Sequence, residues 1–203
     1  MSFEAIPSQH PGASSSMGAA LREVLEKYMM RVDGMLPATV VSYNRTTNRA
    51  TVIPSVARVA TNGQRVPRAP LASIPVLSLG GGGFNVTFPL QPGATGWIEA
   101  SDRDVSLWLQ GQGKREAVPN TGRIHSFSDG RFIPDVLGDY TLPGDTDGAM
   151  VIQHKDGNTY IALHPDKIEL FAPGGVWTNG IRIDTHTHGG VRSGGENTGE
   201  PNP

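Results

Sequence analysis

Residues 146–184 contain four short runs of β-forming residues, and this segment most constrains the possible folds. Glycine, proline and aspartate residues form turn signals between the runs. The runs lie at 149–154, 158–164, 167–171 and 181–184. Strands this short cannot bury a sufficient core within one chain, and their free edges favour aggregation. Winding three copies around one axis solves both problems, because edges pair with neighbouring chains and inward aliphatic side chains share a core.

A His-x-His pair, His186 and His188, follows this segment directly. In an extended strand, side chains two residues apart point to the same side, so both imidazoles can reach one metal ion. A stable transition-metal site takes about four to six ligands. The remaining ligands therefore come from elsewhere in the chain, from water or from other copies. On a threefold axis, six imidazoles would complete an octahedron, with the glycine-rich residues 189–203 folded closely around it. Two further histidines, His154 and His164, sit beside turns and are interpreted as surface or pairing residues.

Residues 36–118 are expected to form a small barrel of the OB-fold type. Short strand-like runs separated by glycine and proline predict it, and 105–109 is interpreted as its last strand. The 26 glycines and 16 prolines among 203 residues favour turns over long helices. The four glycines at 80–83 lack the Lys-Ser/Thr pair of a phosphate-binding loop and predict a flexible loop. Residues 119–145 are expected to be a linker.

Residues 1–35 are predicted to form an arm followed by one amphipathic helix. The arm is rich in proline, serine and glycine, whereas from residue 18 apolar side chains recur at helical spacing. We expect Asp33 and Gly34 to end the helix. Its apolar stripe is expected to pack on its own domain or on a neighbouring subunit, in preference to a membrane surface. The stripe consists of Leu21, Val24, Leu25, Tyr28, Met29 and Val32.

Composition excludes several classes of function. A net charge of −2 gives no basic field, so nucleic-acid binding is not expected. Cysteine is absent, which excludes disulfides, zinc-thiolate sites and iron–sulfur clusters. Apolar runs fall short of a membrane span, and the N-terminus lacks a signal-peptide pattern. We therefore expect a soluble protein made in a cytoplasm.

Two sets of motifs resemble one protein family. The segment 184–190, followed by a glycine-rich stretch and a terminal Pro-Asn-Pro, resembles the apex of the central spike proteins of contractile-tailed bacteriophages and related injection machines. Upstream, residues 93–98, Asp102-Arg103, Trp108 and 123–134 resemble the barrel domain of the same family. The resemblance covers the chain from about Leu36 onward.

The resemblance implies a mainly β homotrimer at the tip of a tail tube. Its parts would be an OB-fold collar, an intertwined β-helix spike at 146–184 and an apex at 185–203. His186 and His188 of each chain would together hold one iron(II) ion per trimer on the threefold axis. Such a spike belongs to the virion baseplate, contacts hub or tail-tube proteins, and pierces the host outer membrane when the sheath contracts. It would be made in the host cytoplasm and act as a structural protein, with no enzymatic activity expected.

Two other functions compete with this one. The run 183–188 reads Ile-Asp-Thr-His-Thr-His, which fits the metal signature of amidohydrolases, but such a barrel needs about 250 residues, mostly downstream of the motif. Cupin and metallo-hydrolase patterns fail because the expected Glu or Asp-His does not follow His188. The second alternative is a tail adaptor that binds a receptor or glycan through its barrel.

Overall fold

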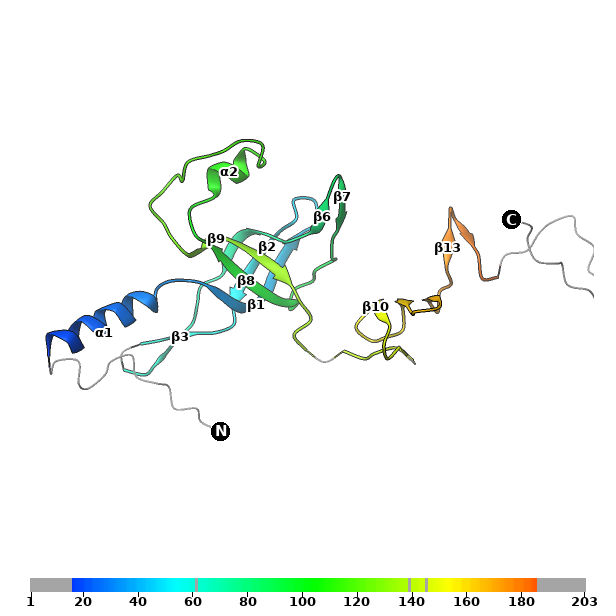
Figure 1. Ribbon diagram of the computed structural model, residues 1–203, viewed down its shortest axis with the longest axis horizontal. Coiled ribbons are helices and arrows are strands. Elements are labelled where there is room, and N and C mark those ends of the chain that lie inside the picture. Colours follow the sequence, from blue (N-terminus) through cyan, green and yellow to red (C-terminus); the bar gives the residue numbers. More distant parts are fainter. Residues whose placement is uncertain (1–15, 61, 139, 145, 186–203) are drawn as a thin grey trace, which may run out of the picture. The chain divides into compact units, whose positions relative to one another are not determined.

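The computed structural model describes residues 16–60, 62–138, 140–144 and 146–185 (Figure 1). The protein is mainly β, with an N-terminal helix and a nearly closed barrel-like sheet, as the sequence predicts. Contacts divide the chain into two compact units, Met1–Leu137 and Gly138–Pro203. Each unit has its own sheet, and the two are considered separately below.

Helix α1, Met17–Met29, is the predicted amphipathic helix. The Ser16 hydroxyl caps its first turn by accepting a hydrogen bond from the Ala19 N–H at 3.2 Å. The helix ends four residues before the expected Asp33, and turn residues bridge the gap. Its apolar side chains are exposed, so packing on its own domain is not seen among the described residues.

Asp33 joins the end of the helical region to the barrel. Its N–H donates to the His125 carbonyl at 2.9 Å, and its carboxylate accepts from the Phe127 N–H at 3.3 Å. Arg68 donates to the other carboxylate oxygen at 3.0 Å and stacks over the Phe127 ring. One side chain therefore holds three segments that are far apart in the sequence.

The first unit is built on a five-stranded sheet with the order β5-β2-β1-β8-β9, shown in the centre of Figure 1. Neighbouring strands are antiparallel, and an isolated parallel bridge between Val76 and Phe132 brings the two ends of the sheet together. This order with a parallel closure fits the Greek-key barrel predicted from the sequence. The strands are β1 Met35–Asn44, β2 Arg49–Pro54, β5 Leu71–Pro75, β8 Thr95–Ser101 and β9 Ser126–Pro134.

The barrel encloses one apolar core. Alternate residues of β1 and β2 point inward, which is the pattern expected of a sheet with one buried face. Phe132 is the largest fully buried side chain and lies at the closure. The buried core consists of Ala38, Val40, Ala50, Val52, Ile74, Val76, Ile98, Phe127 and Phe132.

The structure corrects the expected end of the barrel. Strand β9 lies inside residues 119–145, which the sequence assigned to a linker, and it pairs with β8. The barrel therefore extends well beyond residue 118. The strand was missed because its inward positions include Asp129 and Gly130, which interrupt the apolar alternation. Gly130 is buried against β8, where an added Cβ would lie 2.2 Å from the Glu99 carbonyl oxygen.

The expected strand at 105–109 is also wrong. Residues Ser106–Gln110 form a short helix, α2. The Asp104 carboxylate accepts a hydrogen bond from the Ser106 N–H at 2.9 Å, and this contact favours a helical turn over an extended chain.

Two small hairpins interrupt the chain between barrel strands. The first pairs β3 Arg58–Val59 with β4 Arg65–Val66, and the second pairs β6 Leu79–Gly81 with β7 Phe84–Val86. The glycines expected to form a flexible loop thus form a tight hairpin, with Gly82 and Gly83 at positive φ.

The second unit contains a three-stranded antiparallel sheet, β10-β11-β12, and a separate hairpin. Three of the predicted runs form the sheet, with strands of four residues each: β10 Met150–Gln153, β11 Tyr160–Leu163 and β12 Ile168–Phe171. The hairpin pairs β13 Trp177–Thr178 with β14 Ile181–Arg182.

The close packing of β8 on β9 generates a stability prediction. An added Cβ at Gly96 would lie 2.3 Å from the Ile133 carbonyl oxygen and 2.6 Å from the Phe132 ring. We expect Gly96→Ala to destabilise the barrel by about 1–3 kcal/mol, because backbone and core must shift to admit the methyl group. Chemical denaturation measures the loss. Gly81→Ala is the control because its Cβ meets open space; equal losses in both variants would contradict this account of the packing.

Candidate functional site

The three-stranded sheet of the second unit has one face made entirely of aliphatic side chains. Strand registry places these residues in two rows of three across β10, β11 and β12. We call the set the aliphatic face. Its rows are Met150, Leu163 and Ile168, and Ile152, Ile161 and Leu170.

The aliphatic face is largely exposed in the part of the chain that the structure describes. Its side chains are exposed by between 38% for Leu163 and 71% for Ile168. A soluble sheet normally turns such a face toward a second layer. A contiguous exposed apolar surface of this kind marks a contact with another molecule.

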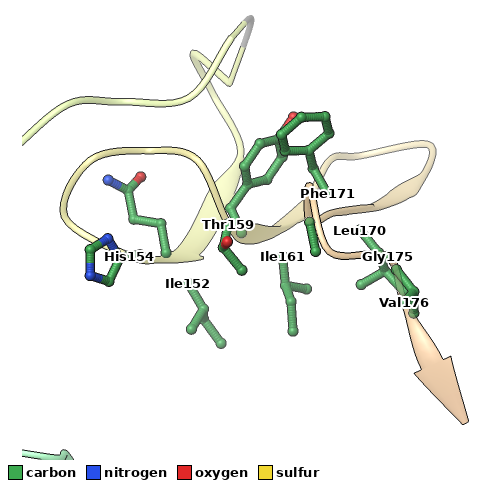
Figure 2. A pocket seen from close by; sticks show the side chains of 11 residues that line it. Ile152, His154, Thr159, Ile161, Leu170, Phe171, Gly175 and Val176 are labelled. Atoms are coloured by element: carbon green, nitrogen blue, oxygen red, sulfur yellow. The ribbon is translucent and has the colours of Figure 1, made fainter. Parts of the chain in front are cut away.

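A hollow runs along one row of the aliphatic face. It has a volume of about 470 Å³, is lined by Ile152, Ile161 and Leu170, and continues to Val176 beyond the sheet. Figure 2 shows Ile152 and Ile161 pointing to the same side of the sheet, while Phe171 points away from them. The lining is almost wholly apolar and suits other aliphatic side chains better than a polar ligand.

The opposite face of the sheet carries a ring stack and a group of polar contacts within the chain. Tyr160 and Phe171 stack with ring centroids 5.3 Å apart, and the Tyr160 hydroxyl donates to Glu169 at 2.7 Å. This hydrogen bond lowers the pKa of Glu169 and raises that of Tyr160. Lys167 and His164 Nε2 each lie 3.4 Å from the same carboxylate. The two faces therefore differ: this polar face is held by a ring stack and polar contacts, whereas the aliphatic face presents only apolar side chains.

The histidines outside the His-x-His pair occupy the expected kind of position. His154 Nδ1 lies 2.8 Å from Asp156, beside the turn after β10, and His164 pairs with Glu169. Within residues 16–60, 62–138, 140–144 and 146–185, no group of three or more His, Asp or Glu side chains could hold a metal ion.

The hairpin β13–β14 leads the chain toward the predicted metal site. Asn179 and Gly180 both have positive φ, at 49° and 81°, and form the two-residue turn that an Asn-Gly pair favours between strands. Strand β13 was not predicted, although this Asn-Gly pair between β-forming residues is a hairpin signal.

Arg182 clamps Asp184 just before the histidine pair. Its Nε and Nη2 donate to the two carboxylate oxygens of Asp184 at 3.0 and 2.9 Å. These hydrogen bonds hold the pKa of Asp184 below its ordinary value. The predicted metal ligands, His186 and His188, lie outside the described residues.

The barrel carries a second ordered polar cluster around Asp104. Arg123 donates to Asp129 at 2.9 Å through both Nε and Nη2 and to Asp104 at 3.2 Å, while Thr121 donates to Asp104 at 2.7 Å. Both carboxylates are buried. The pKa of Asp104 lies well below its ordinary value, chiefly through hydrogen bonds from Ser106 and then from Thr121. The cluster fixes the long loop between β8 and β9, because its members come from both ends of that loop.

No helix in the described parts of the chain is long and apolar enough to cross a membrane.

Two family models match the chain. Residues 36–135 match the model described as the phage protein Gp138 N-terminal domain, and residues 180–202 match the GpV Apex motif. The first match ends at the barrel's last strand, and the second includes both His186 and His188. A search of curated proteins found no match.

The Asp104 cluster generates a prediction of pH dependence. The carboxyl has a lower pKa in the folded protein than its ordinary value of 3.8, so its stabilising contribution is present above that pH and is lost on acidification. We expect the free energy of unfolding of the barrel to fall steeply below about pH 4. The Asp104→Asn variant should be less stable than the parent at neutral pH and should lose less stability on acidification. Denaturant unfolding across this range measures both. Asp102→Asn, outside the cluster, is the control, and a parent-like acid slope in Asp104→Asn would contradict the assignment.

Proposed function

The chain belongs to the central spike proteins of bacteriophage tail tips, and we propose that three copies of it form a membrane-piercing needle. The two family matches span 100 and 23 of its 203 residues. The protein is accordingly a structural component of the virion, associated with other tail and baseplate proteins. The proposal adds the trimer, the piercing step and a metal-locked tip.

The aliphatic face is the observation that carries the trimer. In three copies wound around one axis, each chain would turn its six aliphatic side chains inward, where the chains would cover one another. Each half-exposed aliphatic side chain that becomes buried contributes on the order of 1 kcal/mol. The outer strands β10 and β12 would also gain partners for their free edges. The polar face, which carries the contacts of Tyr160 and Glu169, would remain outside.

Piercing is a mechanical role, and strands that pair between chains suit this role. A needle that transmits axial force fails first where a chain end frays. Interchain pairing distributes the load over three chains, while the shared core resists bending because packed interiors have low compressibility. We infer that sheath contraction drives this needle through the host outer membrane.

The tip would be locked by His186 and His188. Neutral imidazole nitrogens are ordinary ligands of iron(II), zinc and nickel, so the donor set fits a divalent transition metal. The nearest described carboxylate in the sequence, Asp184, is held by Arg182, which leaves the histidines as the expected donors. When bound, iron(II) would link the three chain ends. Binding to the folded trimer and not to unfolded chains adds stability by mass action.

A catalytic role for the Ile-Asp-Thr-His-Thr-His run receives less support. Asp184 of that run is engaged by Arg182, which donates hydrogen bonds to both of its carboxylate oxygens. The residues adjoining the run form a narrow hairpin, not a barrel of parallel strands.

The trimer predicts a solution mass of three times 21.6 kDa. Light scattering on the full chain measures it. Ile161→Asp should weaken association at least about a hundredfold, because three charges would be buried together without partners. Val118→Asp is the matched control, since Val118 is 75% exposed in a barrel loop. A monomeric parent, or an Ile161→Asp variant as trimeric as the parent, would refute the shared core.

The metal lock predicts one iron ion for every three chains. Elemental analysis of the purified protein measures this ratio, and His186→Ala should lose the metal while the trimer persists, because the aliphatic face is untouched. His154→Ala is the control, as its imidazole pairs with Asp156 instead. Unchanged metal content in His186→Ala would eliminate the proposed ligand set.

A further inference from the structure

Helix α1 carries a second uncovered apolar surface, at the other end of the sequence. Leu21, Leu25 and Tyr28 are each more than half exposed, and Val24 and Met29 flank them at 64% and 62%. By contrast Glu23, on the opposite side, is only 8% exposed and pairs with Lys27 at 3.1 Å. A helix that packed its stripe on its own domain would show the reverse pattern.

The spacing of these residues is that of a coiled coil. Gly18, Leu21, Leu25 and Tyr28 follow alternating steps of three and four, which places Gly18 and Leu25 at a positions and Leu21 and Tyr28 at d positions. In this register Val24 falls at g and Met29 at e. Apolar residues at those flanking positions widen the stripe beyond a two-stranded seam.

We propose that the α1 helices of three chains pack against each other as a parallel three-helix bundle, which forms a second trimer contact besides the aliphatic face. This inference rests on the proposed trimer. The occupant of the α1 stripe is therefore a second and third copy of the same helix, not a hub protein or a membrane.

Charge and shape favour this occupant. In a parallel pairing the g residue of one helix meets the e residue of the next heptad in its neighbour, and here Val24 would meet Met29, apolar against apolar. Glu23, Glu26 and Lys27 fall at f, b and c, on the outside of such a bundle. The a and d positions carry no charge, so nothing in the seam would be buried without a partner.

The length of α1 explains why the bundle would depend on the rest of the trimer. Thirteen residues form fewer than two heptads, and isolated helices of this size are marginal in water. Chains already joined elsewhere present their helices to one another at an effective concentration in the millimolar range. Asp33 ties the end of the helical region to the barrel, which limits how far each helix can move from its neighbours.

Cysteine cross-linking of the full-length chain tests the bundle, because the parent contains no cysteine. Leu25→Cys and, at the other core position, Tyr28→Cys each place one thiol per chain in the proposed seam. Ala20→Cys places it at an exposed c position outside the seam. After copper-phenanthroline oxidation, we expect covalent dimers on non-reducing gels in at least one seam variant, in at least about tenfold excess over Ala20→Cys.

Solution mass separates this proposal from the one on which it rests. A trimeric protein whose seam variants both cross-link no more than Ala20→Cys would overturn the bundle and leave the spike intact. A monomeric parent would overturn the shared core and the bundle together. Cross-linking in Ala20→Cys as strong as in the seam would also contradict it, since the helices would then have no fixed face.

Discussion

The size of the C-terminal sheet is the constraint on which the proposed assembly depends. Three strands of four residues offer two faces, and among the described residues one of them is held by local contacts of Tyr160, Phe171 and Glu169. Within the described part of the chain the aliphatic face stays largely exposed, and a contiguous exposed apolar surface of this kind is typical of an interaction site. In the proposed trimer, the neighbouring chains would supply a second layer over it, and one symmetric contact would take the place of a second domain.

The barrel differs from the C-terminal sheet, because its apolar core is formed within one chain. The parallel bridge between Val76 and Phe132 brings the first and last strands of the sheet together around one aromatic side chain. Close approach of β8 and β9 requires Gly96 and Gly130, which have no room for a Cβ. The barrel therefore has a core of its own, whereas the second unit would complete its core only in the proposed trimer.

Sequence reasoning found those parts of the fold whose signal is local. The hairpin of β1 and β2 consists of two runs of β-forming residues around the polar loop 44–48, and the C-terminal runs are bounded by turn residues, so both were predicted. Strand β9 was missed because its buried Asp129 is satisfied by Arg123, a partner that periodicity does not identify. The apolar run that became α2 fits a strand and a helix equally well, and a hydrogen bond from Ser106 to Asp104 decided between them.

The candidate site, too, was predicted from the sequence only in part. The sequence shows that residues 149–171 are rich in aliphatic side chains, but only the strand registry shows that the six side chains of the aliphatic face lie on one side of the sheet. The Arg182–Asp184 clamp involves a charged pair two residues apart, which alternation alone describes as two exposed polar positions. The assignment of His186 and His188 as metal ligands rests on the sequence motif and on the family match, because the described part of this segment ends at Thr185.

The junction at Asp33 has a mechanical consequence. Its N–H and its carboxylate engage His125, Phe127 and Arg68 at once, so tension along the helical region would load all three contacts in parallel. Bonds loaded in parallel share the force and break together, whereas bonds loaded in series open one at a time. Asp33 would therefore transmit small displacements of the helix to the barrel through contacts that share the load.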